Sequence, residues 1–166
     1  MIHDIRIRTA TPEDVPALQR LIEESVRALS SNDYSKDQIE AALGTAWGVD
    51  TQLILDGTFF LVETAGHIVG CGGWSKRRTL FGADSQPGRQ VELLDPVRDS
   101  ARIRAFFVHP GYVRQGIGRA LLERCETEAR AHGFKSAELL ATLPGYRLGR
   151  LATRAMPQSS LYCPMD

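Results

Sequence analysis

Two glycines and two arginines lie close together at the predicted start of a helix, a position that suits phosphate binding. Gly116 and Gly118 are separated by one residue, and Arg114 and Arg119 flank them. Glycine leaves backbone N–H groups uncrowded, and the helix dipole adds about half a positive charge at the N-terminus. The two guanidinium groups add full charges that pair well with phosphate oxygens. These residue types at this spacing predict a phosphate-binding loop.

Two common nucleotide-binding loops fit this segment poorly. A dinucleotide-binding fold requires a third glycine, where this chain has Leu121, and an acid at a strand end, whereas Glu138 is predicted within a strand. A P-loop requires Lys and then Ser or Thr, but Arg119 and Ala120 follow Gly118. A nucleotide-dependent oxidoreductase is therefore a distant hypothesis. A plain helix start with solvated arginines is the other alternative.

The wider segment 108–122 reads Val-His-Pro-x-Tyr-x-Arg-Gln-Gly-Ile-Gly-Arg-x-Leu-Leu. It resembles the acetyl-CoA-binding motif of the GNAT N-acetyltransferase family. Gly133-Phe134 after the helix, and the order of predicted elements from about residue 3 to 145, are also similar to that family. The resemblance implies an α/β (α+β) fold with a mixed central sheet that splays open after the strand at 101–108. Helices flank this sheet.

The resemblance also implies which residues hold acetyl-CoA, the expected cosubstrate. The pantetheine arm is expected to fill the splay like an extra strand and to pair with the backbone of the strand that precedes the loop. The loop itself is expected to hold the pyrophosphate, although Val113 departs from the Gln or Arg that is common there. The implied contacts are Phe106, Phe107 and Val108 for pantetheine, and Arg114, Gln115, Gly116, Ile117, Gly118 and Arg119 for pyrophosphate.

The implied reaction is direct attack of an amine on the thioester, which requires a proton acceptor, an oxyanion donor and an acid for the thiolate. A backbone N–H near Val108 is the expected oxyanion donor. Arg102 and Arg104 occupy the strand positions where many family members carry an acid. Glu138 is the candidate base and Tyr146 the candidate acid, although the tyrosine comes about three positions early. An ordinary polar strand residue and a turn tyrosine are the alternatives.

Hydrophobic periodicity and turn signals predict the elements that position these residues. A strand at 101–108, the glycine loop, a helix at 116–132 and a strand at 136–142 form one βαβ unit, so the two strands should be parallel. Residues 76–100 are predicted to form a long loop. The remaining elements are a strand at 2–9, a helix at about 12–30, a short helix capped by Ser35 and ending near Gly44, and a hairpin of strands at 59–63 and 68–74.

Composition narrows the classes of partner. The chain has 166 residues, with 20 Lys and Arg against 20 Asp and Glu. Zero net charge argues against nucleic-acid binding through bulk electrostatics, and the length suits one domain, expected to span 1–166. No apolar run is long enough to cross a membrane. The cysteines are three in number and lack metal-site spacing, so we expect no metal and a reducing, cytoplasmic compartment.

The C-terminal segment departs from the family pattern, which has a helix and two further strands after residue 145. In place of that pattern, residues 151–156 and 161–165 are predicted to form only short strands. The C-terminal part of the fold is therefore expected to be shortened relative to the family. A homodimer that completes the sheet is a hypothesis. The expected function is N-acetyl transfer to an amine of a small molecule or peptide. The alternative is a non-catalytic acyl-CoA-binding or sensor domain.

Overall fold

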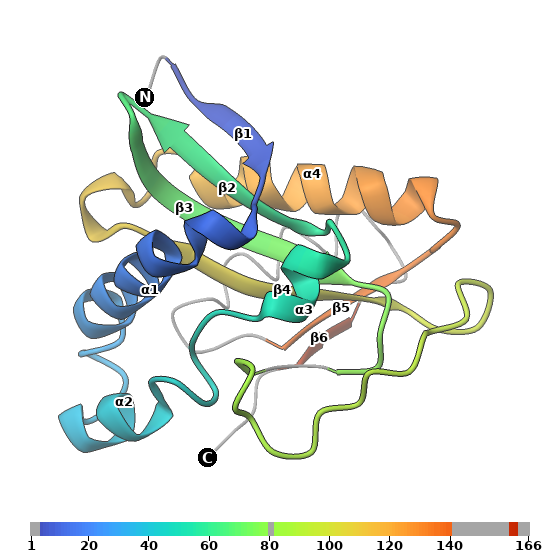
Figure 1. The fold of residues 1–166 in the computed structure, drawn as a ribbon, viewed down its shortest axis with the longest axis horizontal. Helices are drawn as coiled ribbons and strands as arrows, with labels where there is room; N and C mark the ends of the chain where they lie inside the picture. Colours follow the sequence, from blue (N-terminus) through green and yellow to red (C-terminus); the bar gives the residue numbers. More distant parts are fainter. Residues whose placement is uncertain (1–3, 80–81, 141–159, 163–166) are drawn as a thin grey trace.

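The computed structural model describes residues 4–79, 82–140 and 160–162, which form one sheet with helices on both faces (Figure 1). The described strands follow the chain order β1-β2-β3-β4-β5-β6 across the sheet. The pairs from β1 to β4 are antiparallel, and the pairs β4–β5 and β5–β6 are parallel. The mixed, open sheet predicted from the sequence is confirmed. The strands are β1 (Arg6–Thr9), β2 (Phe59–Thr64), β3 (His67–Ser75), β4 (Ala101–Val108), β5 (Ala137–Leu140) and β6 (Ser160–Tyr162).

The hairpin of β2 and β3 turns through two residues. Ala65 and Gly66 both have positive φ angles, of 48° and 77°. This backbone belongs to the tight turns whose twist matches that of the flanking strands. The hairpin was predicted, and β3 continues from it as far as Ser75, next to β4.

Three helices cover one face of the sheet and a fourth covers the other (Figure 1). The first face carries α1 (Val15–Leu29), α2 (Lys36–Ala42) and α3 (Thr51–Leu55), and the second carries α4 (Ile117–Ala131). The capping box at Ser35 is confirmed, because Gln38 N donates to its hydroxyl over 3.1 Å. The short helix α3 was not predicted; Asp50 caps it by accepting from Gln52 N over 3.1 Å.

Helix α4 ends as predicted, on a glycine in the left-handed conformation. Gly133 has a φ of 91°. Its N–H donates to Arg130 O over 2.9 Å, and Phe134 N donates to Ala129 O over 3.1 Å. These two bonds satisfy carbonyls at the helix end and turn the chain back towards β5. Phe134 then packs in the core between α4 and the sheet.

The segment 76–100, called here the β3–β4 arm, connects the end of β3 to the start of β4. Its two legs are joined at the base by backbone hydrogen bonds from Arg78 N to Glu92 O (3.0 Å) and from Thr79 N to Gln90 O (2.8 Å). Leu94 N also donates to Lys76 O over 2.7 Å. The described part of the arm contains no helix and no extended strand, as predicted, but it is anchored rather than free of the domain.

Candidate functional site

The turn between β4 and α4 leaves several backbone N–H groups pointing past the start of the helix. Arg114 has a φ of 61° and Gly116 one of 87°, so the chain is left-handed on both sides of Gln115. The bond from Ala120 N to Gly116 O, over 3.0 Å, begins the helical ladder. The N–H groups of residues 117–119 precede that bond and have no acceptor within the helix. This end of α4 is therefore suited to bind an anion.

The side chains of the turn divide into anchored and exposed groups. Ile117 is buried in the core between α4 and the sheet, whereas Arg114, Gln115 and Arg119 are exposed. All six residues predicted to hold a pyrophosphate, from Arg114 to Arg119, lie on this one turn. Their contact with a cofactor stays a prediction, but the turn supplies both uncompensated amides and exposed guanidinium groups.

Helix α1 contacts the same turn through His109, a residue of the 108–122 motif to which the sequence analysis assigned no role. His109 Nδ1 accepts from Gly111 N over 3.0 Å, and His109 Nε2 lies 3.2 Å from Glu24 Oε2. Because Nδ1 accepts, the ring proton lies on Nε2, the nitrogen that faces the glutamate. The ring of Tyr112 packs edge-on against that of His109. These contacts fix the path of the chain from β4 into the loop.

Strand β4 contains a bulge in its middle. Cys71 pairs with Phe107 and Gly73 with Arg104, so two residues of β4 lie opposite Gly72 alone. One of the two, Ala105, has a φ of 58°, the left-handed value that a bulge can require. A Cβ on Gly72 would lie 2.6 Å from the ring of Phe106, which explains the glycine there.

Beyond the bulge, β4 extends past its described pairing with β5. The last described pair is Ile103 with Leu139, whereas β4 continues to Val108. His109 N donates to Val69 O on β3, and the N–H groups of successive residues in a strand point to opposite edges. The N–H of Val108 therefore points to the β5 side. The residues predicted to contact pantetheine, Phe106, Phe107 and Val108, all lie on this stretch.

The candidate base Glu138 lies in a polar row that crosses three strands. Ser75 pairs with Arg102, and Arg102 pairs with Glu138, so the three residues share one face of the sheet. Ile103 and Leu139 belong to the core under α4, which places this row on the opposite face. The Arg102 guanidinium forms an ion pair with the Glu138 carboxylate. Burial lowers the pKa of Arg102, with the charge of Asp99 opposing that effect.

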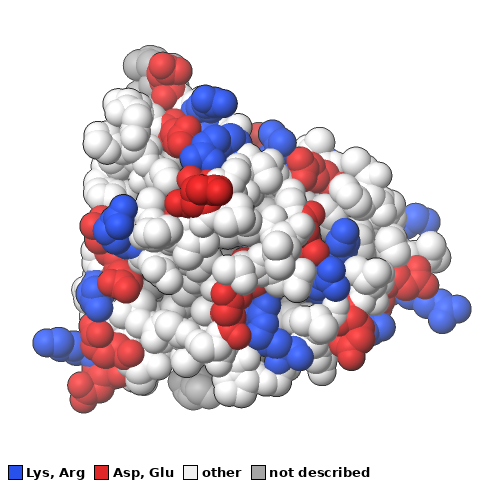
Figure 2. All heavy atoms as spheres, viewed as in Figure 1, with Lys and Arg blue, Asp and Glu red and all other residues white. Residues whose placement is uncertain are grey.

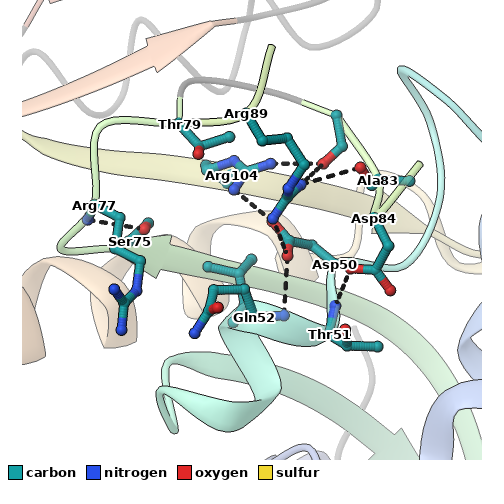
Figure 3. Close-up of polar contacts among 12 residues, drawn as sticks. Asp50, Thr51, Gln52, Ser75, Arg77, Thr79, Ala83, Asp84, Arg89 and Arg104 are labelled. Atoms are coloured by element: carbon teal, nitrogen blue, oxygen red, sulfur yellow. Dashed lines mark hydrogen bonds and ion pairs between the residues drawn. The ribbon is translucent and has the colours of Figure 1, made fainter. Parts of the chain in front are cut away.

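A buried ion cluster, which the sequence analysis missed, lies next to this row (Figure 3). Arg104 and Arg89 both bind the carboxylate of Asp50, the latter over 2.8 Å. Arg104 is 4% exposed and Asp50 is fully buried. Burial lowers the pKa of Arg104, and the charge of Asp50 opposes that shift. Arg104 and Arg89 also donate to the carbonyl of Gly82, so the cluster fastens the β3–β4 arm to β4 beside the bulge.

The other candidate residues and surfaces add little to the site. Tyr146, the candidate acid, lies outside the described residues. Among the residues that the structure describes, no group of three or more His, Cys, Asp or Glu side chains could hold a metal ion.

No helix in the described ranges is long and apolar enough to cross a membrane. Acidic and basic side chains are interspersed over the face seen in Figure 2, without a large patch of one sign.

Comparison with known proteins relates this arrangement to one family. A profile described as the acetyltransferase (GNAT) family matches residues 18–156. No curated protein sequence matches the chain. Solved structures share its fold at low sequence identity. A GCN5-related N-acetyltransferase from Rhodopseudomonas palustris has a TM-score of 0.61 and 20% identity, with 93% of this chain and 82% of that one covered.

Two further solved structures were determined with the cofactor bound. The PaiA N-acetyltransferase from Thermoplasma acidophilum, in complex with coenzyme A, has a TM-score of 0.56 and 16% identity over 79% of this chain and 75% of that one. A GNAT family acetyltransferase from Brucella melitensis, in complex with acetyl-CoA, has a TM-score of 0.55 and 18% identity. That match covers 87% of this chain and 80% of the other.

Proposed function

The chain belongs to the GNAT acetyltransferase family, and we propose that it transfers the acetyl group of acetyl-CoA to a primary amine of a small molecule or peptide. One observation carries the proposal: the uncompensated amides at the start of α4 follow directly on the stretch of β4 that extends beyond Ile103. The proposed phosphate site is thereby connected to a strand edge that has no pairing partner among the described residues. Such a pair of features suits a ligand with a pyrophosphate at one end and an amide-containing arm at the other.

The described residues fit acetyl-CoA in both charge and shape. The amides of residues 117–119, with the exposed Arg114 and Arg119, would bind the pyrophosphate. The β5-facing edge of residues 106–108 would pair with the two amides of pantetheine, as strands pair in a sheet. A neutral chain can hold this anionic molecule because its positive potential is concentrated at one helix start.

The proposed reaction has a direct path for atoms and protons. The amine nitrogen attacks the thioester carbonyl carbon, a C–N bond forms and the C–S bond breaks. In this proposal, the N–H of Val108 stabilises the oxyanion that forms on the way. Glu138 accepts the proton that the nitrogen loses, and we keep Tyr146 as the proposed donor of a proton to the departing thiolate.

The competing proposal is a non-catalytic acyl-CoA-binding or sensor domain. It is favoured by the arginines at positions 102 and 104, where many family members carry an acid, and by the ion pair that engages Glu138. Release of free CoA thiol in the presence of amines distinguishes the two functions. An acetyltransferase releases thiol in proportion to acetylated amine, whereas a sensor binds acetyl-CoA and releases none with any class of amine.

A further inference from the structure

The guanidinium of Arg102 has a hydrogen-bond donor that the described protein does not use. One terminal nitrogen binds Glu138, but the buried Nε–H has no hydrogen-bond partner among the described residues. Leaving a buried donor unpaired is unfavourable, and such groups in folded proteins call for an explanation. The side chain of Arg102 is nevertheless 14% exposed, so part of the guanidinium remains open to a ligand.

A second arginine belongs to the same end of β4. Arg78, at the base of the β3–β4 arm, follows Ser75, the strand partner of Arg102, by three residues, and it contacts Asp99, which precedes Arg102 by three residues. The charge of Arg78 adds to the lowering of the pKa of Arg102. Its side chain is 46% exposed, and its contact with Asp99 spans 3.7 Å, which is too long for a hydrogen bond. Arg102, which is paired with Glu138, and Arg78, at the base of the arm, therefore both have donor groups that the described residues do not engage.

This electrostatic arrangement selects among amines. An acceptor amine reaches an enzyme as an ammonium ion at neutral pH, and near Glu138 its positive charge would be repelled by both guanidinium groups. A carboxylate on the same molecule would offset that repulsion and would accept the paired N–H groups that guanidinium presents. Adjacent strands are about 4.8 Å apart, so the amine and the carboxylate would be separated by only a few bonds.

We infer that the acceptor is an amine that also carries a carboxylate, with the carboxylate bound by Arg78 and Arg102 and the amine facing Glu138. This assignment rests on the proposed acetyltransferase function and names its substrate class. Arg104 lies two residues along β4 on the same face, and its buried Nε–H also has no partner among the described residues. It supports the site rather than binding substrate, because its side chain is only 3% exposed and Asp50 and Gly82 occupy both of its terminal nitrogens. That cluster holds the arm, and with it Arg78, in place over the sheet.

Matched pairs of acceptors test the inference through release of CoA thiol. Glycine, β-alanine and 4-aminobutyrate are compared with methylamine, ethylamine and propylamine, which differ only in lacking the carboxylate. The amidated dipeptides Asp-Ala and Asn-Ala form a further pair that detects a peptide acceptor with an acidic side chain. We expect kcat/KM for at least one carboxylate-bearing amine to exceed that of its partner by about tenfold or more.

Substitutions of the two arginines test whether they cause the preference for carboxylate-bearing amines. Arg78→Gln is expected to raise KM for the favoured carboxylate-bearing amine about tenfold and to leave the Kd for acetyl-CoA unchanged. The value of kcat/KM for its partner should not fall, because the substitution removes a charge that repels the plain ammonium ion. Arg102→Lys, which keeps the charge and removes the Nε–H donor, should raise the same KM. Arg98→Gln is the control, because Arg98 is on the arm and its side chain is 85% exposed.

The failures of the two proposals are distinguishable. Equal kcat/KM values within every pair, or an unchanged KM in both arginine variants, would overturn the carboxylate site and leave the acetyltransferase function standing. Binding of acetyl-CoA without thiol release with any amine would overturn both proposals in favour of the sensor domain.

Discussion

Gly70 on β3 and Ile117 on α4 meet so closely that a Cβ on the glycine would lie 2.5 Å from Ile117 Cγ2. Ile117 is the first residue of the helix, and the amides of the proposed phosphate site belong to the same turn. The glycine therefore sets how closely the start of α4 approaches the sheet. Strand and loop are positioned together through this one contact.

Gly70→Ala should push the start of α4 away from β3. Forcing an extra methyl into a packed core costs about 1–3 kcal/mol, and here the strain falls on the loop that we propose binds phosphate. We expect a lower free energy of unfolding in urea and a weaker Kd for acetyl-CoA. In the double variant Gly70→Ala with Ile117→Ala, the added methyl gains space. The double variant should therefore lose less stability than the sum of the losses in the two single variants. Strict additivity would contradict the contact.

Arg104→Gln should strongly destabilise the domain. The substitution leaves the fully buried carboxylate of Asp50 with one of its two guanidinium partners, and breaking a buried pair costs about 3–5 kcal/mol. Urea unfolding followed by tryptophan fluorescence measures the loss. Arg98→Gln, at an exposed pair with Asp95, is the control and should change stability by no more than about 0.5 kcal/mol. Similar values for both variants would mean that the buried cluster is not a structural anchor.

Glu138→Gln should separate catalysis from cofactor binding. Removing a general base typically lowers kcat by about 10²- to 10⁴-fold, because the amine must then lose its proton to water. The Kd for acetyl-CoA should be unchanged, since the proposed cofactor contacts lie on residues 106–108 and 114–119. Glu123→Gln, at an exposed position on α4, is the matched control. Wild-type kcat in the Glu138 variant would assign proton removal to another group.

Cys71 and Cys125 should not react with thiol reagents in the folded protein. Both are fully buried, and burial raises the pKa of Cys71 to about 12 and that of Cys125 well above its usual value. The reactive thiolate is therefore scarce at the pH of a thiol-release assay. At least two of the three thiols should gain reactivity with Ellman's reagent when the protein is unfolded in guanidinium chloride. Fast labelling of the native protein at Cys71 or Cys125 would contradict this burial.

The elements predicted correctly carry their signals locally. Alternating or helical periodicity, a two-residue turn, the capping box at Ser35 and Gly133 each lie within a few residues of the structure that they specify. Helix α3 was missed because it has only five residues, too few for a helical period to be visible. The bulge at Ala105 was missed because alanine gives no indication of a positive φ.

Long-range polar contacts were the least predictable part of the site. Asp50 lies 39 positions before Arg89 and 54 before Arg104, and only the packing of α3 and the arm against β4 brings the three together. Arg102 and Glu138 likewise meet through the register of β4 and β5, which the strand patterns do not specify. The glycine loop was recognisable because all its residues are contiguous.

Calorimetric titration with acetyl-CoA tests the central claim most directly, using the native chain, Gly118→Leu and the control Thr127→Leu at an exposed position of the same helix. Leucine favours helix, so Gly118→Leu should keep the fold while its side chain crowds the amides at the start of α4. We predict that the native chain and the control bind acetyl-CoA equally well, and that Gly118→Leu loses binding with an unchanged urea midpoint. No binding by the native chain at millimolar acetyl-CoA, or equal binding by Gly118→Leu, would contradict the assignment of this loop as the pyrophosphate site.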